Sequence, residues 1–520
     1  MNRTIFLISA SLLLVIFCFG IEKGSAASSG PKRGGMITVG TGTDVVAVDP
    51  HVTSASITAV VMNHVFERLV GYGENLELVP ILAERWEASP DLKTYLFFLR
   101  KGKLFHNGRE MVADDVKYSI ERILDPKTNN PRRSTLENIS RIEVVDKYTV
   151  RLHMNKPDGT LLSSLAFTTP IMAVVPREEV EKQGGTMKHP VGTGPYKFVE
   201  WKPDRHVLLE RFEQYKPQSG PMNGFGGEQI AYLDRIKFVP VPEESVASMA
   251  LLNKEIDFLL HVPFKNVEKF RTDYGKRGIA LEEVEGLDWF GIFFGCNKLV
   301  TKEVKFRRAC AYAIDRSIVA EAATRGYAAI NSSFVAVKNY YYTPFHKKWY
   351  PKDVEKAKQL LKESGYQGEE IPLLTTKQYP MMYDQAVAIQ SELVAAGIKA
   401  KLEVLDWPVL LERMYSGNFQ IISFGVSAKP DPALAYLEAK YAGFEEQYPR
   451  LREIREKAGM TLDFEARKKL FEEAHGIVYE GVPAIIVYNF NHFNAYWNYV
   501  KGFKLFCTNQ PRLWNVWIDK

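Results

Sequence analysis

Residues 371–405, IPLLTTKQYPMMYDQAVAIQSELVAAGIKAKLEVL, contain the pattern that decides the fold class. The apolar run from Ile371 to Thr375 predicts a strand, and Lys399 to Leu405 predicts another. Between them, Tyr383 to Ala396 predicts a helix that ends at Gly397. A strand, a helix and a strand in this order form a right-handed crossover, which places both strands in parallel in one sheet. We therefore expect an α/β protein with an open, largely parallel sheet.

The segments on both sides repeat this alternation. Asp353 to Ser364 predicts an amphipathic helix, Pro408 to Tyr415 a further helix, and Phe419 to Phe424 a third strand. Ligands of open parallel sheets bind in the crevice beyond the carboxyl ends of the strands. In this chain the crevice is expected to collect Leu405 to Trp407 and Phe424 to Asp431.

The N-terminal half also mixes strands and helices. Asp114 is expected to cap a helix that runs to about Leu124. A hairpin is expected around Asp146, and Tyr196 to Trp201 and His206 to Arg211 predict two more strands. Because 520 residues exceed one compact domain, we expect several α/β lobes, each with its own core.

The charge of the chain argues against a nucleic-acid partner. Lys and Arg number 67 against 62 Asp and Glu, which gives a formal net charge of +5, and the two signs are interleaved. A nucleic-acid-binding surface needs a concentrated basic patch or stripe. We therefore expect no nucleic acid among the partners.

The first residues predict export. Arg3 precedes the apolar stretch Ile5 to Phe19, and the small residues up to Ala26 offer a signal-peptidase site, so residues 1–26 are predicted to be a cleaved signal peptide. The stretch is shorter than the roughly 20 residues that span a bilayer. A retained N-terminal anchor and a lipoprotein modified at Cys18 are the alternatives. We expect a periplasmic, water-soluble protein.

Three cysteines remain after the leader, namely Cys296, Cys310 and Cys507. An odd number leaves at least one free thiol in an oxidising compartment. Since Cys296 and Cys310 lie in apolar sequence, we expect buried thiols there rather than a disulfide.

The chain carries no signature of catalysis or of cofactor binding. It lacks a Gly-x-Ser-x-Gly elbow, a Gly-rich phosphate loop and a His-Glu-x-x-His pair, and its ten histidines are scattered, so neither a metal nor a cofactor is expected. It is instead rich in aromatics, with 25 Tyr, 30 Phe and 8 Trp. Most of them belong in cores, but a pocket walled by Tyr and Trp suits the reversible capture of a small organic molecule. We expect a binding protein, not an enzyme.

Five ordered motifs resemble a known family, the extracellular solute-binding proteins of family 5, which are the oligopeptide, dipeptide and nickel-binding components of ABC importers. The motifs are LAERWEASPDLKTYLFFLRKGKLFHNG from Leu82, VADDVKYSIER from Val112, HPVGTGPYKFVEWKPDRHVLLER from His189, LNKEIDFL from Leu252 and FRRACAYAIDRSIVAEAATRGYA from Phe306. Together they extend over most of the mature chain.

The resemblance implies a three-lobed periplasmic binding protein of type II with a hinge between lobes I and III. Lobe I would combine residues 27–66, 191–285 and 487–520, lobe II would be residues 67–190, and lobe III residues 286–486. Two crossing segments would join lobes I and III, which close on a peptide or other small solute. A monomer that delivers its solute to the permease subunits of an ABC importer is expected.

The expected ligand loop departs from the peptide binders that it resembles. Those proteins place a Trp and, three residues later, an Asp before an acidic-Pro pair, and the Asp holds the ammonium group of the peptide. Alignment on Asp431 and Pro432 puts Gly425 and Ala428 at these positions. A buried ammonium without a partner costs several kcal/mol. Another acid would have to replace the missing one, and the candidates are Asp44, Asp406 and Asp431.

The resemblance also assigns Trp407 to the ligand. The complete set of expected ligand residues is Trp407, Gly425, Val426, Ser427, Ala428, Asp406, Asp431, Thr43, Asp44 and Phe294. Peptides, opines, other amino-acid conjugates, sugars and metal chelates stay open as cargo. Two alternative functions stay open as well, an exported hydrolase that uses the acid pair Asp406 and Asp431, and a chaperone-like or receptor role for exposed surfaces.

Overall fold

The computed structural model describes residues 30–427 and 429–520. The predicted signal peptide, with its cleavage site, and Ala428 lie outside the described residues.

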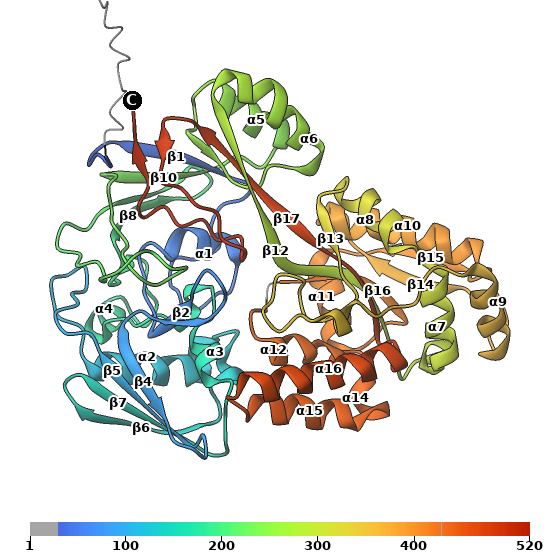
Figure 1. The fold of residues 1–520 in the computed structure, drawn as a ribbon. Coiled ribbons are helices and arrows are strands. Elements are labelled where there is room, and N and C mark those ends of the chain that lie inside the picture. Colours follow the sequence, from blue (N-terminus) through green and yellow to red (C-terminus); the bar gives the residue numbers. More distant parts are fainter. Residues whose placement is uncertain (1–29, 428) are drawn as a thin grey trace, which may run out of the picture.

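One mixed sheet runs through the whole molecule (Figure 1). Its strands lie in the order β15-β14-β16-β12-β17-β11-β1-β10-β9-β8, and β13 pairs with β17. Their bounds are β1 Met36–Thr41, β8 Tyr196–Lys202, β9 His206–Arg211, β10 Arg235–Pro240, β11 Phe258–Leu259, β12 Ile279–Phe294, β13 Ala328–Ile330, β14 Ile371–Thr375, β15 Ala400–Val404, β16 Ile421–Val426 and β17 Ala484–Trp497.

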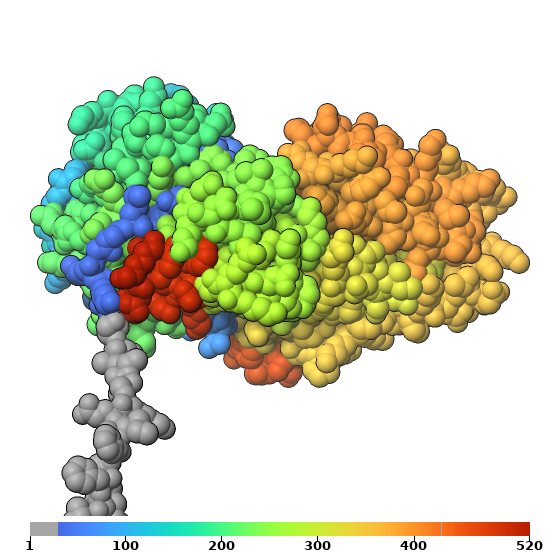
Figure 2. Space-filling view, turned by 90° about the horizontal axis from the view of Figure 1, so that it is seen from above, coloured from blue at the N-terminus to red at the C-terminus, as the bar shows by residue number. Residues whose placement is uncertain are grey.

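Two long antiparallel strands connect the two halves of the molecule. β12 has 16 residues and β17 has 14, and they pair from Ile279 opposite Trp497 to Phe293 opposite Ala484. We call the part built on β1 and β8 to β11 the β1 half, and the part built on β14 to β16 the β14 half. Seen from above, the yellow and orange surface of the β14 half lies on one side and the blue, green and red surface on the other, with light-green residues between them (Figure 2). The expected pair of crossing segments is thus present.

The β14 half contains the predicted crossover. β14 pairs in parallel with β15, Ile371 opposite Ala400, and also in parallel with β16. The helix between β14 and β15 begins at Pro380 rather than Tyr383, since Pro is favoured at the first helical position. The expectation of a largely parallel sheet is wrong, because β12 runs antiparallel to both β16 and β17. The sheet is mixed: β14, β15 and β16 are parallel to one another, whereas the crossing strands and the pairs of β9 with β8 and β10 are antiparallel.

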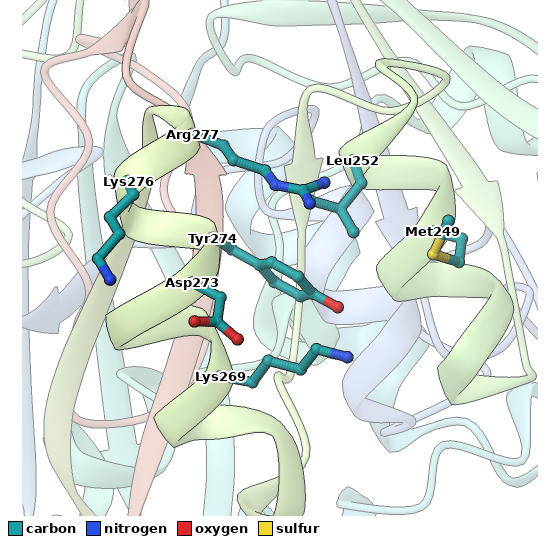
Figure 3. A pocket seen from close by; sticks show the side chains of 7 residues that line it. All are labelled: Met249, Leu252, Lys269, Asp273, Tyr274, Lys276 and Arg277. Atoms are coloured by element: carbon teal, nitrogen blue, oxygen red, sulfur yellow. The ribbon is translucent and has the colours of Figure 1, made fainter.

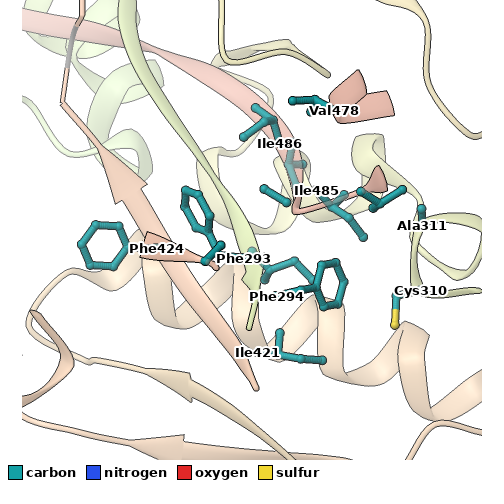
Figure 4. Packing of buried hydrophobic residues seen from close by; sticks show 14 of the residues in the cluster. Phe293, Phe294, Cys310, Ala311, Ile421, Phe424, Val478, Ile485 and Ile486 are labelled. Carbon is teal, nitrogen blue, oxygen red and sulfur yellow. The ribbon is translucent and has the colours of Figure 1, made fainter. Parts of the chain in front are cut away.

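Helices cover the β14 half on both sides of this sheet (Figure 1). The helices before β16 are α7 Val304–Ala313, α8 Arg316–Thr324, α9 Val354–Glu363, α10 Pro380–Ala395 and α11 Trp407–Ser416. Those after it are α12 Pro432–Tyr436, α13 Glu438–Tyr441, α14 Phe444–Gln447, α15 Pro449–Gly459 and α16 Phe464–Gly481. Figure 4 shows the core of this half, where Phe293, Phe294, Ile421, Ile485 and Ile486 from three adjacent strands pack together.

A second sheet stands apart from the main one. It has the order β4-β5-β7-β6 and a core of its own, distinct from the core around β1. The bounds are β4 Ala83–Ala88, β5 Thr94–Leu99, β6 Ile139–Asp146 and β7 Thr149–Met154, with helices α2 Ala113–Leu124 and α3 Leu161–Leu165. β2 Val70–Tyr72 and β3 Leu78–Pro80 form a separate two-stranded sheet, and α1 Ser56–Met62 and α4 Arg177–Lys182 pack in the core around β1. The predicted hairpin after Asp146 is confirmed.

The predicted start of α2 is wrong by two residues, because the residue that precedes the helix is Val112 and not Asp114. The helix begins at Ala113, and the carboxylate of Asp115, not Asp114, accepts a hydrogen bond from the backbone N–H of Val112 at 2.9 Å. Asp115 also accepts two hydrogen bonds from Arg109, at 2.6 and 3.0 Å. The buried acid therefore points back to the start of the helix, while Asp114 is exposed.

The remaining elements complete the β1 half. They are α5 Glu244–Leu252, α6 Phe264–Lys269, β18 Val500–Lys501 and β19 Trp517–Ile518. Cys296, Cys310 and Cys507 are buried free thiols, as predicted for the first two. Within residues 30–427 and 429–520, no helix combines the length and the apolar character needed to cross a bilayer. The lobe boundaries drawn from the sequence stay a prediction.

Candidate ligand-binding site

A cavity of about 710 Å³ lies beside the crossing strands and takes its walls from both halves. The β1 half contributes Ser56, Val60, Glu244, residues 261–265 and residues 508–510. The β14 half contributes Ala323, Arg325, residues 379–382, Asp384, Trp407 and residues 425–427, and the crossing strands contribute Asp288, Phe290 and residues 490–493. A change in the angle between the halves would open or close this space.

Aromatic rings form one part of the wall. Trp407 begins α11, and its indole lies 4.7 Å from the ring of Tyr379 and 5.7 Å from that of Phe424, measured between centroids. Phe290 and Phe490, from the two crossing strands, lie edge to face at 5.3 Å. Such surfaces bind flat or apolar groups.

Close packing against Phe290 explains why position 425 is a glycine. It pairs with Phe290 across β16 and β12, and a Cβ at this position would lie 2.4 Å from Cζ of that ring. The Phe290 side chain therefore occupies the space that a larger residue at position 425 would need. The glycine makes this aromatic wall possible.

Charged groups form a second part of the wall. Asp288 Oδ2 lies 2.9 Å from Nε2 of His492, and Glu244 pairs with Lys265 at 2.5 Å. Burial raises the pKa of Asp384, while the nearby positive charge of Arg325 opposes that shift. The cavity thus offers both signs of charge beside its aromatic surface.

The family follows from comparison with known proteins. The sequence model of the bacterial extracellular solute-binding proteins, family 5, matches residues 77–447. The chain belongs to this family.

Its similar relatives have different names. A dipeptide-binding protein of Escherichia coli is 26% identical over 85% of this chain and 86% of its own length. A heme-binding protein A of Haemophilus influenzae is 30% identical over 81% of each chain. The structure of the periplasmic binding protein AgaA of A. tumefaciens in complex with agropinic acid is 27% identical, covers 94% of this chain and 99% of its own, and has a TM-score of 0.78. The type II fold of periplasmic binding proteins, expected from the sequence, is confirmed.

This family 5 protein brings four of the sequence-predicted ligand residues together. Trp407, Gly425, Val426 and Ser427 all line the cavity. Ala428, which would follow them, lies outside the described residues.

The other predicted residues lie elsewhere. Thr43 is exposed, and Phe294 is fully buried in the core of the β14 half (Figure 4). Asp44 accepts hydrogen bonds from Trp201 Nε1 at 3.0 Å and from the backbone N–H of Asp204 at 2.9 Å. Thr43, Asp44 and Phe294 are absent from the cavity wall.

The acid pair of the hydrolase alternative is not assembled. Asp406 is exposed ahead of α11, whereas Asp431 is buried and accepts two hydrogen bonds from Arg467, at 2.7 and 2.9 Å. Neither residue lines the cavity. The hydrolase alternative therefore has no support in this geometry.

Sequence reasoning missed the polar residues around the crossing strands. Asp288 and His492 are separated by 204 positions, and His261 and Asn509 by 248. The pairing of β12 with β17 brings Asp288 and His492 together, and the folding of the C-terminal loop against the residue after β11 brings Asn509 to His261, so no local pattern indicates either contact. Within the described part of the chain, no group of three or more His, Cys, Asp or Glu side chains is placed to hold a metal ion.

A second pocket, of about 560 Å³, lies on the outside of the β1 half, between α5 and the segment from Lys269 to Arg277 (Figure 3). The ring of Tyr274 lies between Lys269 and Arg277, which are 5.2 and 6.0 Å from its centroid. All of its walls come from one half. Closure of the halves would not enclose a solute there.

Proposed function

We propose that this chain is the periplasmic solute-binding component of an ABC importer, and that it captures a peptide or peptide-like organic solute in the 710 Å³ cavity. The observation that carries this proposal is the origin of the wall, which comes from the β1 half, the β14 half and the two strands that connect them. Cavities of roughly 300 to 1,000 Å³ bury most of a small ligand's surface.

Closure is the physical basis of capture. Two strands are the main connection between the halves in the main sheet, so a small change along β12 and β17 alters the angle between the halves. A solute that contacts both halves stabilises the closed form by its additional contacts there. The closed form, as a monomer, then delivers the solute to the permease subunits at the membrane. The lobe division drawn from the sequence, with its hinge between lobes I and III, is part of this proposal.

The proposal includes capture without turnover and a periplasmic location. The cavity wall lacks the acid pair Asp406 and Asp431, and the predicted leader directs the chain across the membrane. Trp407 and the backbone of Gly425 to Ala428 are the proposed contacts on the side of the β14 half. Dipeptide, heme and agropinic acid in the names of similar proteins indicate that cargo differs within the family.

Native mass spectrometry tests this function. The protein is purified from cells grown on a rich medium, its mass is measured under native conditions, and any released small molecule is identified after denaturation. We expect one intact organic solute per chain. A chemically altered product would revive the enzyme alternative, and a chain that retains no solute from any medium would contradict the proposal.

A further inference from the structure

Two segments of the β1 half meet at the wall of the cavity through the side chains of His261 and Asn509. Nδ1 of His261 lies 3.1 Å from Nδ2 of Asn509, although 248 positions separate the two residues in the chain. Both residues line the cavity. The pair therefore joins the segment after β11 to the C-terminal segment, at a surface that a bound solute would contact.

The backbone of both residues lies in the left-handed region, with a φ of 59° at His261 and 56° at Asn509. This conformation is uncommon for residues that have a Cβ, and such residues concentrate at functional sites. Residues 260–262 donate three successive backbone hydrogen bonds, to β1, to Asn494 Oδ1 and to β17, at 3.0, 3.0 and 2.9 Å. The surrounding strands thus hold His261 in this conformation at the cavity wall.

The contact with Asn509 decides which ring nitrogen of His261 carries the proton. Nδ2 of Asn509 is a donor, so Nδ1 of the imidazole accepts this hydrogen bond and has no proton. The proton of the neutral ring then lies on Nε2, which has no hydrogen-bond partner among the described residues. The ring is accessible from the cavity but surrounded by protein, and this desolvation lowers the pKa of His261 to about 4, from an ordinary value of 6.5. His261 is therefore neutral at pH 7 and offers one N–H donor.

A solute group that contacts this N–H has to supply a hydrogen-bond acceptor. A carbonyl or carboxylate oxygen accepts such a bond, whereas an ammonium group has only donors and would leave Nε2–H unpaired. The wall of the β14 half contains the rings of Tyr379 and Trp407, which suit flat or apolar groups. The cavity thus fits a solute that combines an oxygen acceptor with a flat or apolar part.

We propose that His261 binds the cargo: its Nε2–H donates a hydrogen bond to a carbonyl or carboxylate oxygen of the solute, and Asn509 positions the imidazole for this contact. The inference rests on the proposed function, because it names the solute chemistry at one wall of the same cavity. The flat or apolar part of the solute lies against Trp407.

The first test uses a filtered yeast extract as the probe. The protein is freed of bound solutes by unfolding and refolding, incubated with the extract, separated from unbound material and analysed by native mass spectrometry. His261→Phe keeps a planar ring and removes both nitrogens, so we expect it to retain about five- to tenfold less solute than the wild type. His189→Phe, the same change at an exposed histidine outside the cavity wall, should retain as much as the wild type.

A second portion of the extract distinguishes the two kinds of oxygen. It is treated with acidic methanol, which converts carboxylates to neutral methyl esters. Solutes that the wild type retains from both portions would present a neutral carbonyl oxygen to His261, and solutes lost from the treated portion a carboxylate. If His261→Phe does not fold, His261→Gly, which accepts the positive φ and has no side chain, takes its place with the same expectation.

Nuclear magnetic resonance of protein labelled with ¹⁵N in its histidine rings tests the role of Asn509. At pH 7 we expect a neutral His261 ring with its proton on Nε2, and a shift of the Nε2 resonance when the retained solute is added. The resonance is assigned by its absence from the His261 variant. Asn509→Gly removes the amide and accepts the positive φ, so the proton should be shared between both ring nitrogens and less solute should be retained.

The outcomes separate the inference from the proposed function. Equal retention by the His261 variant and the wild type, retained solutes without a carbonyl or carboxylate oxygen, or a proton on Nδ1 of His261 in the wild type would overturn the inference and leave the function in place. Retention of no solute by the wild type would overturn both.

Discussion

Arg467 Nη2 donates hydrogen bonds to both carboxylate oxygens of Asp431, at 2.7 and 2.9 Å, and the two side chains are only 9% and 3% exposed. The same carboxylate accepts a hydrogen bond from Ser163 Oγ at 2.8 Å. Asp431, at the start of α12, thereby links this helix to α16 through Arg467 and to α3 through Ser163. Helix α3 lies beside the second sheet. The ion pair therefore fixes Asp431 at the start of α12.

Asp431→Asn is expected to destabilise the ligand-free protein. The substitution leaves the Arg467 guanidinium buried without a counter-charge, which costs about 3 to 5 kcal/mol. Urea unfolding of the stripped protein measures the change. Ser163→Ala is the matched control, since it removes one hydrogen bond to the same carboxylate and should cost about 1 kcal/mol. Equal losses in the two variants would contradict the role given to the ion pair.

Trp407→Ala is expected to weaken cargo binding by at least about tenfold, or about 1.4 kcal/mol. The indole supplies a ring surface of the cavity and contacts Tyr379 and Phe424. Calorimetric titration with the solute identified by mass spectrometry gives the affinity, and the melting temperature without solute should be nearly unchanged. Trp349→Ala, at an exposed site outside the cavity wall, should bind as the wild type does. Unchanged affinity in Trp407→Ala would remove this residue from the site.

Gly425→Ala is expected to displace the ring of Phe290. The new methyl group would lie 2.4 Å from Phe290 Cζ, and overpacking of this kind typically costs about 1 to 3 kcal/mol. Unfolding of the stripped protein should show the loss, and the solute should bind more weakly because the aromatic wall has moved. Gly42→Ala is the control, since its Cβ would meet nothing within 4 Å. Two variants of equal stability would show that Phe290 adjusts freely.

Acid is expected to destabilise the protein through His64. Burial lowers the pKa of this imidazole to about 4, from an ordinary value of 6.5. Its Nε2 accepts a hydrogen bond from the backbone N–H of Leu513 at 3.0 Å, and its Nδ1 lies 3.2 Å from the carbonyl oxygen of Val61. The unfolded chain therefore binds a proton more readily between about pH 6.5 and pH 4, so stability falls as the pH falls through this range.

The size of this effect follows from the pKa difference. Between pH 7 and pH 5, His64 should account for a loss of about 2 kcal/mol in the free energy of unfolding. Urea unfolding at the two pH values measures the loss in the wild type and in His64→Gln, which has no group that titrates there. The variant should lose about 2 kcal/mol less than the wild type between the two conditions. Identical losses would contradict the assignment to His64.

The sequence predicts local elements well because their signals are local. The apolar run Ile371–Thr375 is β14 to the residue, and the helix expected from Asp353 to Ser364 is α9, with these two residues as its caps. The start of α2 was expected two residues too late, with Asp114 as its cap. The residue before the helix is Val112, and Asp115 in the first turn accepts hydrogen bonds from the backbone N–H of Val112 and from Arg109, a contact that depends on the folded loop.

Local sequence patterns predict the residues of the candidate site less well than they predict the helices and strands. The resemblance to family 5 indicated Trp407 and Gly425, and both line the cavity. Asp44 and Asp431 were plausible acids in sequence, but other side chains occupy their carboxylates. Asp288 and His492 carry no local signal, because the two strands that bring them together at the cavity wall are more than 200 positions apart in the chain.

The measurement that tests the account most directly is small-angle X-ray scattering of the protein with and without its solute. The account predicts a smaller radius of gyration at saturation, because the β1 half and the β14 half approach each other across the cavity. The stripped protein should show the larger radius, and Trp407→Ala should need more solute to reach the smaller one. A radius that stays the same at saturating solute would contradict capture by closure.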